Sequence, residues 1–272
     1  MNNDQLLQTI KQAAKDKVTV LHLFNQQLTT LPPELFELHQ LEELGLSNNQ
    51  LTTLPPSLAK LSRLKVLYLS NNKFSQFPQA LCRLPRLKFL YLSHNQLTTL
   101  PYQIYQLSHL QALYLNGNQL TTLPESLSKL TQLRLLVLSD NQLRQLPSGI
   151  GKLSRLEILY LNNNRLTKLP PELCHLSLLR RLYLSDNQLT ELPLECYQLS
   201  HLEKLTLFEN PLPIEMELFK FVDKPCIVIN YLTEQKLKQE MRKEQRYRSV
   251  IDMAWWLLTI GFMILLLMEW VD

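Results

Sequence analysis

One pattern repeats along most of the chain and limits what it can fold into. The segment LEELGLSNNQL at 41–51 returns as LKVLYLSNNKF, LKFLYLSHNQL and LQALYLNGNQL, four further copies follow, and an earlier copy begins at Val18. Consecutive copies are 23 residues apart throughout, with no insertion. A unit this short cannot bury its own apolar face, so neighbouring units must stack into one elongated solenoid.

Leucines alternate with other residues inside each copy, as Leu67 and Leu69 do around Tyr68. Alternation puts the two leucines on one face of a short strand and the residue between them on the other. Strands of successive units then pair in parallel, roughly 4.8 Å apart. The sequence therefore predicts an α/β repeat solenoid. A parallel β-sheet lines its concave side, and short extended, 3-10 or helical segments form its convex side.

Asparagine occupies one anchor position in eight of the nine units, and Gln26 replaces it in the first. A buried amide can satisfy backbone N–H and C=O groups where the chain turns out of each strand. Proline follows six residues after the anchor in the first eight units and stiffens the descending loop. We interpret both positions as structural.

The repeat divides the chain into segments with different expected roles. A solenoid needs its apolar ends covered, and 1–17 and 213–232 flank nine repeats at 18–212. We expect an N-terminal cap helix at 1–17 and a C-terminal cap at 213–232. The side chains expected to face the first repeat are Leu6, Leu7, Ile10, Ala13 and Ala14.

The C-terminal segment has the composition of a membrane anchor. Residues 250–271 would make about 33 Å of helix, enough for a hydrocarbon core of about 30 Å. Tryptophans stand near both ends of this segment, and the preceding residues 233–249 are basic. We expect a transmembrane helix at 250–271 and a basic juxtamembrane segment at 233–249. The alternative is a buried or interfacial helix.

The units are similar to the leucine-rich repeat, LxxLxLxxNxL, over 18–212. Their second halves, such as TTLPPSLAKLSR, resemble the 23-residue LxxLPxxLxxL subclass. That subclass occurs in intracellular scaffold proteins related to Ras signalling and in bacterial Roco-type repeat arrays. The resemblance implies a protein-binding function, with a small GTPase or a signalling complex as the partner.

No pattern of catalytic or metal-binding residues emerges from the sequence. SGIGKL at 148–153 lacks the first glycine and the final Ser or Thr of a phosphate-binding loop. Cys174, His175, Cys196 and His201 lie in adjacent repeats, but Cys196 occupies a core position and is expected to be a small buried hydrophobe. We therefore expect no enzyme activity, no cofactor and no metal.

Net charge, cysteine pattern and targeting signals indicate where the protein is located and whether it binds nucleic acid. A net charge of +4 is too weak to indicate nucleic acid. Four cysteines without a CxxC pair give no sign of a disulfide framework. There is no apolar signal-peptide run in 1–17 and no Asn-x-Ser/Thr sequon. We expect a single-pass membrane protein with its repeats on the cytoplasmic side.

Two columns of residues should face outward from the predicted sheet and form a partner-binding strip. One column is rich in tyrosine and the other in aliphatic residues, and charged residues replace them at both ends. Contiguous exposed apolar surface usually marks an interface, and tyrosine is frequent at binding hot spots. The alternative is a tyrosine ladder that only packs along the sheet. The predicted binding residues are Val66, Tyr68, Phe89, Tyr91, Tyr114, Leu135, Val137, Ile158, Tyr160 and Tyr183.

The sequence thus predicts a membrane-tethered scaffold or adaptor for a cytosolic protein. Two alternatives come from other functional classes. One is a sensor or receptor for a small or microbial ligand, which needs the repeats outside the cytosol. The other is a structural membrane protein that associates with itself.

Overall fold

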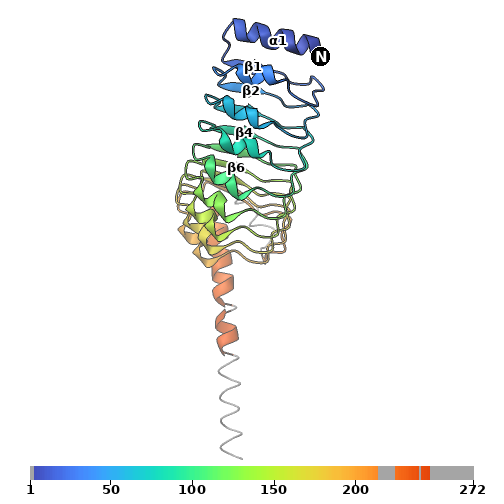
Figure 1. Cartoon of the computed structure of the whole chain (residues 1–272). Helices are drawn as coiled ribbons and strands as arrows, with labels where there is room; N and C mark the ends of the chain where they lie inside the picture. The colour runs from blue at the N-terminus through green and yellow to red at the C-terminus, as the bar shows by residue number, and fades with distance from the viewer. Residues whose placement is uncertain (1–2, 214–223, 239, 246–272) are drawn as a thin grey trace, which may run out of the picture.

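Nine short strands form one parallel sheet in chain order in the computed structural model, which describes residues 3–213, 224–238 and 240–245. Each strand pairs with the next at an offset of one repeat, so that Leu44 lies opposite Leu67. The strands succeed one another along the long axis of the molecule, with α1 at one end (Figure 1). They are β1 Val20–His22, β2 Glu43–Gly45, β3 Val66–Tyr68, β4 Phe89–Tyr91, β5 Ala112–Tyr114, β6 Leu135–Val137, β7 Ile158–Tyr160, β8 Arg181–Tyr183 and β9 Lys204–Thr206.

A five-residue 3-10 helix lies between each pair of consecutive strands. A proline precedes every one of these helices; Pro55, for example, has extended backbone angles and leads into η2. The fixed φ of proline favours such an extended approach. The prediction of short convex segments is confirmed in its 3-10 form. The helices are η1 Pro33–Glu37, η2 Pro56–Lys60, η3 Gln79–Arg83, η4 Tyr102–Gln106, η5 Glu125–Lys129, η6 Ser148–Lys152, η7 Pro171–His175 and η8 Leu194–Gln198.

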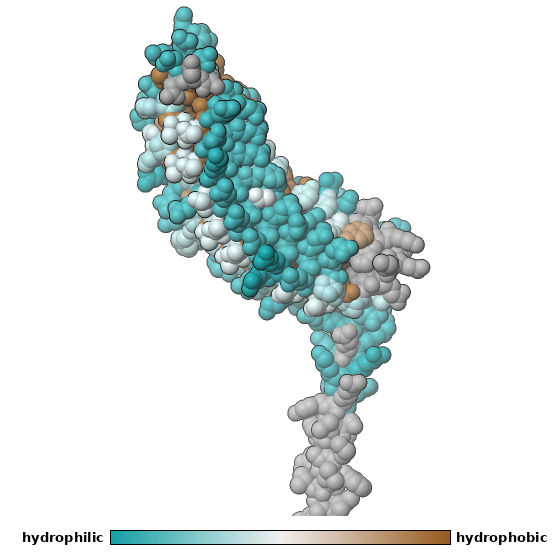
Figure 2. Space-filling model, turned by 90° about the vertical axis from the view of Figure 1, so that its right-hand side faces the viewer, coloured by the Kyte–Doolittle hydropathy of each residue, from teal (hydrophilic) through white to brown (hydrophobic). Residues whose placement is uncertain are grey.

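The core is one continuous column of leucine that runs through all the repeats. Each fully buried leucine stabilises the fold by roughly 1.5–3 kcal/mol relative to an exposed one. On the face shown in Figure 2, hydrophilic residues predominate and hydrophobic residues emerge in small patches. The second repeat shows the pattern with seven buried leucines: Leu41, Leu44, Leu46, Leu51, Leu54, Leu58 and Leu61.

Helix α1, Asn3–Lys15, covers the first repeat as the sequence predicts. Leu6, Ile10 and Ala13 are buried and belong to the common core. Leu7 is half-buried, and the expectation for Ala14 is wrong, because Ala14 is exposed. With a spacing of 3.6 residues per turn, Leu6, Ile10 and Ala13 make a narrow stripe that leaves Ala14 beside it.

Residues 225–238 and 240–245 are helical and follow the last repeat. Val228, Ile229 and Leu232 are buried in the core cluster, and Lys236 forms an ion pair of 3.0 Å with Glu191. The predicted C-terminal cap is described only in part, since 214–223 lie outside the described residues.

The predicted transmembrane helix at 250–271 lies entirely outside the described residues, and so do 246–249 of the basic segment. Among the residues that the structure describes, no helix combines the length and the apolar character that crossing a bilayer requires.

The anchor asparagines bond to backbone groups of two repeats at once. Asn118 accepts a hydrogen bond from the Leu97 N–H at 3.0 Å and donates to the Leu92 and Leu115 carbonyls at 3.0 and 2.9 Å. Asn49, Asn72, Asn95, Asn141, Asn164, Asn187 and Asn210 repeat this arrangement. The predicted asparagine ladder is confirmed.

The residue before each anchor has a left-handed backbone, which the sequence analysis did not identify. Its φ lies between 50° and 67° in every repeat. Asn, Asp and Gly tolerate this region best, and they fill most of the column. At Gly117, a Cβ atom would also collide with the imidazole of His94. The members are Asn25, Asn48, Asn71, His94, Gly117, Asp140, Asn163, Asp186 and Glu209.

Cys174 and Cys196 form a disulfide between η7 and η8, with their Cα atoms 4.8 Å apart. Cys196 is buried, as predicted, but its bond to Cys174 was not predicted from the sequence. The two cysteines are 22 residues apart. That is one less than the repeat length, so they occupy neighbouring rather than equivalent positions. Cys82 is buried with a free thiol, and Cys226 is exposed.

Candidate binding surface

The outer face of the sheet, here called the concave face, carries all ten predicted binding residues, which lie on strands β3 to β8. Each is half-buried, so its side chain packs against neighbours and still reaches solvent. The parallel register lines them up in two columns, because Val66 lies opposite Phe89, and Tyr68 lies opposite Tyr91. The structure therefore brings the predicted residues together on one face.

The tyrosines stack on one another in two groups. Ring centroids are 4.6 Å apart for Tyr68 and Tyr91 and 4.4 Å for Tyr91 and Tyr114, and a second stack joins Tyr160 and Tyr183 at 4.3 Å. These spacings are shorter than the roughly 4.8 Å between strands, as expected on the inside of a curve. The stack is a packing ladder whose half-buried tyrosines still reach solvent.

The stack continues toward β1 through two rings that the sequence analysis did not assign to the strip. Gly45 has no side chain at the next tyrosine position, and the rings of Phe24 and His22 lie where its Cβ would be. The Phe24 ring meets Tyr68 edge-on with centroids 5.8 Å apart. The sequence did contain a sign of this arrangement: Gly45 stands at a tyrosine position, and the preceding repeat has a phenylalanine, Phe24, near the equivalent position.

Packing in the stack changes the acidity of the central phenol. Burial raises the pKa of Tyr91 to about 12, and the neighbouring Tyr114 and Tyr68 add to the shift. Burial also raises the pKa of Tyr68 and of Tyr160. Tyr91 is therefore neutral at any physiological pH and offers a hydrogen-bonding hydroxyl rather than a charge.

The second column supplies aliphatic surface beside the rings. Leu135 and Ile158 are half-buried neighbours on β6 and β7, whereas Ala112 on β5 is buried. The column ends in charge at Arg181 and Lys204, and the Lys204 ammonium lies 5.9 Å from the centroid of the Tyr183 ring. The strip thus has an apolar centre and a charged end.

The upstream edge of the sheet, just before each strand, carries ion pairs between repeats. Lys65 bonds Glu42 at 2.6 Å, and this hydrogen bond is the main reason that the pKa of Glu42 is lowered. Two more pairs are Arg134–Glu157 at 3.3 Å and Arg180–Glu203 at 3.0 Å. Solvent screens such exposed pairs, so they contribute little to the stability of the fold. These pairs also neutralise Lys65, Arg134 and Arg180, whose ionic partners were not evident from the sequence.

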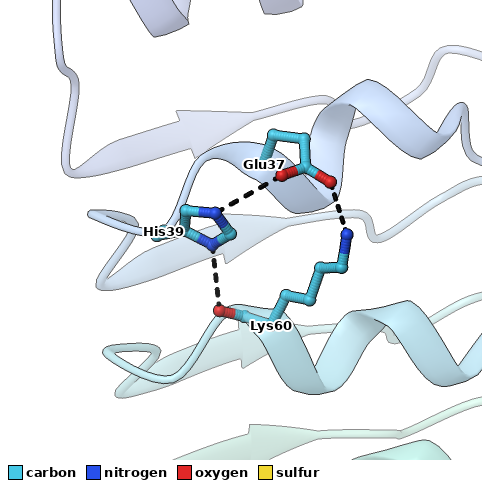
Figure 3. A network of polar contacts seen from close by, with 3 residues as sticks. All are labelled: Glu37, His39 and Lys60. Atoms are coloured by element: carbon cyan, nitrogen blue, oxygen red, sulfur yellow. Dashed lines mark hydrogen bonds and ion pairs between the residues drawn. The ribbon is translucent and has the colours of Figure 1, made fainter.

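A similar polar network links the repeats on the convex side (Figure 3). The Lys60 ammonium bonds a Glu37 carboxylate oxygen at 2.6 Å, and His39 lies 3.4 Å from the other oxygen of Glu37. His39 also contacts the Lys60 carbonyl oxygen at 3.3 Å. The bond from Lys60 is the main cause of the lowered pKa of Glu37. These contacts tie consecutive repeats to each other.

The convex side has an aromatic cluster that the sequence analysis did not single out. Tyr102 and Tyr105 meet edge-on at 5.4 Å, and the Lys129 ammonium lies 4.9 Å from the Tyr105 centroid. A nearby hollow of about 400 Å³ is lined by Leu54, Pro56, Gln79, Ala80, Cys82, Arg83, Gln103 and Gln106. The cluster has no aliphatic column beside it and is smaller than the concave strip.

The segment with an incomplete phosphate-loop pattern is the 3-10 helix η6. The Gly149 N–H donates to the Glu125 carboxylate at 3.1 Å, so an anionic side chain already occupies the place that a phosphate would need. Ile150 and Leu153 are buried in the core. Among the described residues, no group of three or more His, Cys, Asp and Glu side chains is arranged to hold a metal ion.

Family models for the leucine-rich repeat match the chain at 16–74 and 39–97, and a leucine-rich-repeat region model matches 72–161 and 125–222. The chain belongs to the leucine-rich repeat family. Proteins of this family are typically binding modules for proteins or other ligands rather than enzymes. A comparison with curated proteins finds no match.

Several solved leucine-rich repeat structures are similar to this one. The protein LIC12759 of Leptospira interrogans is 33% identical, with a TM-score of 0.68 over 75% of this chain and 59% of that protein. The plant peptide hormone receptor RGFR1, solved in complex with RGF2, is 31% identical, with a TM-score of 0.64 over 71% of this chain and 32% of the receptor. The GASSHO1/SCHENGEN3 ectodomain of Arabidopsis thaliana, solved with CASPARIAN STRIP INTEGRITY FACTOR 2, is also 31% identical, with a TM-score of 0.63 over 72% and 27%. This chain thus spans less than two thirds of each of these proteins.

Proposed function

We propose that this leucine-rich repeat protein is a membrane-tethered scaffold or adaptor that binds a cytosolic protein on its concave face. One observation carries the proposal: a half-buried strip of stacked tyrosines beside aliphatic side chains on a sheet held by the asparagine ladder. Rigid aromatic surface gives contact area at a small entropic cost, and an apolar centre with a charged rim is typical of interfaces. Catalysis has no part in this proposal.

The partner class rests on the form of the repeat unit. The 23-residue LxxLPxxLxxL unit favours membership of the subclass found in Ras-related scaffolds, and so favours a small GTPase or a signalling complex. The apolar segment 250–271 and the basic residues before it favour a C-terminal anchor with the repeats on the cytoplasmic side.

Site-specific photo-crosslinking tests where the partner binds. A photoreactive phenylalanine analogue replaces Tyr114 on the concave face or Tyr102 on the convex face of the full-length chain, in cells that express it. We expect a defined cross-linked partner from position 114 and none from position 102. The reverse pattern would refute the concave assignment.

A second candidate function is a receptor for a ligand on an oxidising side of the membrane. The Cys174–Cys196 disulfide favours it, because disulfides persist in oxidising compartments and are rare in the cytosol. The two plant receptors solved with their ligands are consistent with such a role. This candidate requires the repeats outside the cytosol.

Thiol trapping separates the two candidates. Cells are quenched in acid, free thiols are blocked with one alkylating reagent, and thiols released by reduction are labelled with another. The adaptor proposal expects the reducing cytosol to keep the Cys174–Cys196 bond open, so that both cysteines carry the first label, as free Cys82 should. The receptor candidate expects them to carry the second label, together with protection of the repeats from protease added to the cytosolic side.

A further inference from the structure

Between β3 and β8 the tyrosine column has one position without a ring, and no ring of the described residues takes its place. Val137 on β6 pairs with Tyr114 on one side and with Tyr160 on the other. Stacked ring pairs occur on both sides of this position but not across it. The Tyr114 and Tyr160 rings therefore flank a single missing rung, two interstrand steps or roughly 9.6 Å apart.

This spacing matches one inserted ring. Consecutive rings of the column are 4.3–4.6 Å apart, so a ring midway between Tyr114 and Tyr160 has a favourable stacking distance to both. The short side chain of Val137 forms the floor of the gap, and Leu135 and Ile158 lie along its side. All three are half-buried and apolar.

The same column has another position without a ring, next to β3. At Gly45 the rings of Phe24 and His22 occupy the space, and Phe24 reaches Tyr68. An aromatic ring thus fills one vacancy in the column from within the chain. No described ring fills the vacancy at Val137.

Charge along the two edges of the sheet indicates what surrounds that ring. On the upstream edge of β4–β9, taken here with the first residue of each strand, Glu157 and Glu203 pair with Arg134 and Arg180. The cations Lys88, Arg181 and Lys204 have no carboxylate partner among the described residues, so this edge is net positive. The opposite edge over the later repeats carries Asp140, Asp186 and Glu209. Acidic residues of a partner are attracted to the first edge and repelled by the second.

We propose that the gap above Val137 is a specificity site that takes one aromatic side chain from an acidic segment of a partner protein. This inference rests on the proposed function, since it assigns a determinant within the same face. The inserted ring stacks between Tyr114 and Tyr160 and completes the column. Neighbouring acidic side chains face the upstream edge.

The test uses three blocked tripeptide amides as probes: acetyl-Glu-Tyr-Glu, acetyl-Glu-Leu-Glu and acetyl-Lys-Tyr-Lys. The full-length protein carries ¹³C-labelled valine methyl groups, and the Val137 signals are assigned with Val137→Thr. We expect acetyl-Glu-Tyr-Glu to shift the Val137 methyl signals upfield through its ring current. It should bind about tenfold more tightly than acetyl-Glu-Leu-Glu, since two aromatic contacts are gained.

Val137→Tyr fills the gap and should abolish the binding of acetyl-Glu-Tyr-Glu, whereas Val137→Thr keeps the gap and should retain it. The inference is overturned if the tyrosine and leucine peptides bind equally, if acetyl-Lys-Tyr-Lys binds more tightly than acetyl-Glu-Tyr-Glu, or if Val137→Tyr binds normally. The proposed function fails separately, when the partner cross-links from the convex position 102 and not from position 114.

Discussion

At the scale of single residues, the fold depends on positions whose chemistry is repeated in every unit. The anchor asparagine could be predicted from the sequence, because its spacing and its turn-forming neighbours indicate a buried amide. The left-handed residue before it was not predicted, although Asn, Asp and Gly dominate that column. His94 and Glu209 weaken the compositional signal, and the backbone angle became evident only in three dimensions.

Replacing Asn141 with leucine tests the ladder. Asn141 accepts from the Leu120 N–H and donates to the Leu115 and Leu138 carbonyls, each at 3.0 Å. Leucine leaves these buried groups unsatisfied, so we expect the free energy of unfolding to fall by about 1–3 kcal/mol. Urea denaturation measures it, with the adjacent Gln142→Ala as the control. Equal stability of Asn141→Leu and the wild type would refute the structural role.

At the scale of elements, the strands and the N-terminal helix followed from periodicity, because each leucine position has a fixed place in the core. The short repeat required short convex segments, but it left open whether they are extended, 3-10 or helical. The packing between repeats was harder to predict. The ion pair between Lys65 and Glu42 joins residues 23 apart, and the Cys174–Cys196 bond joins residues 22 apart. Both contacts depend on which side chains of adjacent repeats meet. Because the two cysteines are offset by one residue from equivalent repeat positions, the repeat alignment does not pair them.

The tyrosine stack predicts a loss of stability at high pH. Because burial raises the pKa of Tyr91 to about 12 from an ordinary value near 10, the folded state favours the neutral phenol. The stabilisation should be complete below about pH 10 and should be lost as the pH rises toward 12. Urea midpoints measured across this range should fall less in Tyr91→Phe than in the wild type. Tyr102→Phe, on the convex side, should keep the full fall, and identical curves for all three proteins would contradict the prediction.

The disulfide should contribute measurably to the stability of the last repeats. It closes a loop of 22 residues, for which the loop-entropy relation gives about 3 kcal/mol. We expect Cys174→Ser with Cys196→Ser to lower the free energy of unfolding of oxidised protein by about that amount. Cys82→Ser, a buried position without a bond, controls for the polar substitution. Reduction should destabilise the wild type and leave the double variant unchanged.

At the scale of the whole molecule, the solenoid holds a mostly apolar strip in a fixed arrangement on one face. The ten residues of the strip could be predicted from the sequence, since a two-residue alternation in a parallel sheet aligns equivalent positions. Their stacking in two groups, the use of Phe24 to cover Gly45 and the gap at Val137 could not. These features depend on ring positions between repeats rather than on any one repeat.

The binding strip is tested most directly by the dissociation constant of the cross-linked partner, measured with purified full-length protein and with two double variants. Tyr91→Ala with Tyr114→Ala removes the centre of the strip and should raise the dissociation constant at least about tenfold, or about 1.4 kcal/mol. Lys60→Ala with Lys129→Ala changes the convex side and should leave it unchanged. If the lysine pair abolishes binding and the tyrosine pair does not, the concave face is not the binding site and the tyrosines serve only to pack the sheet.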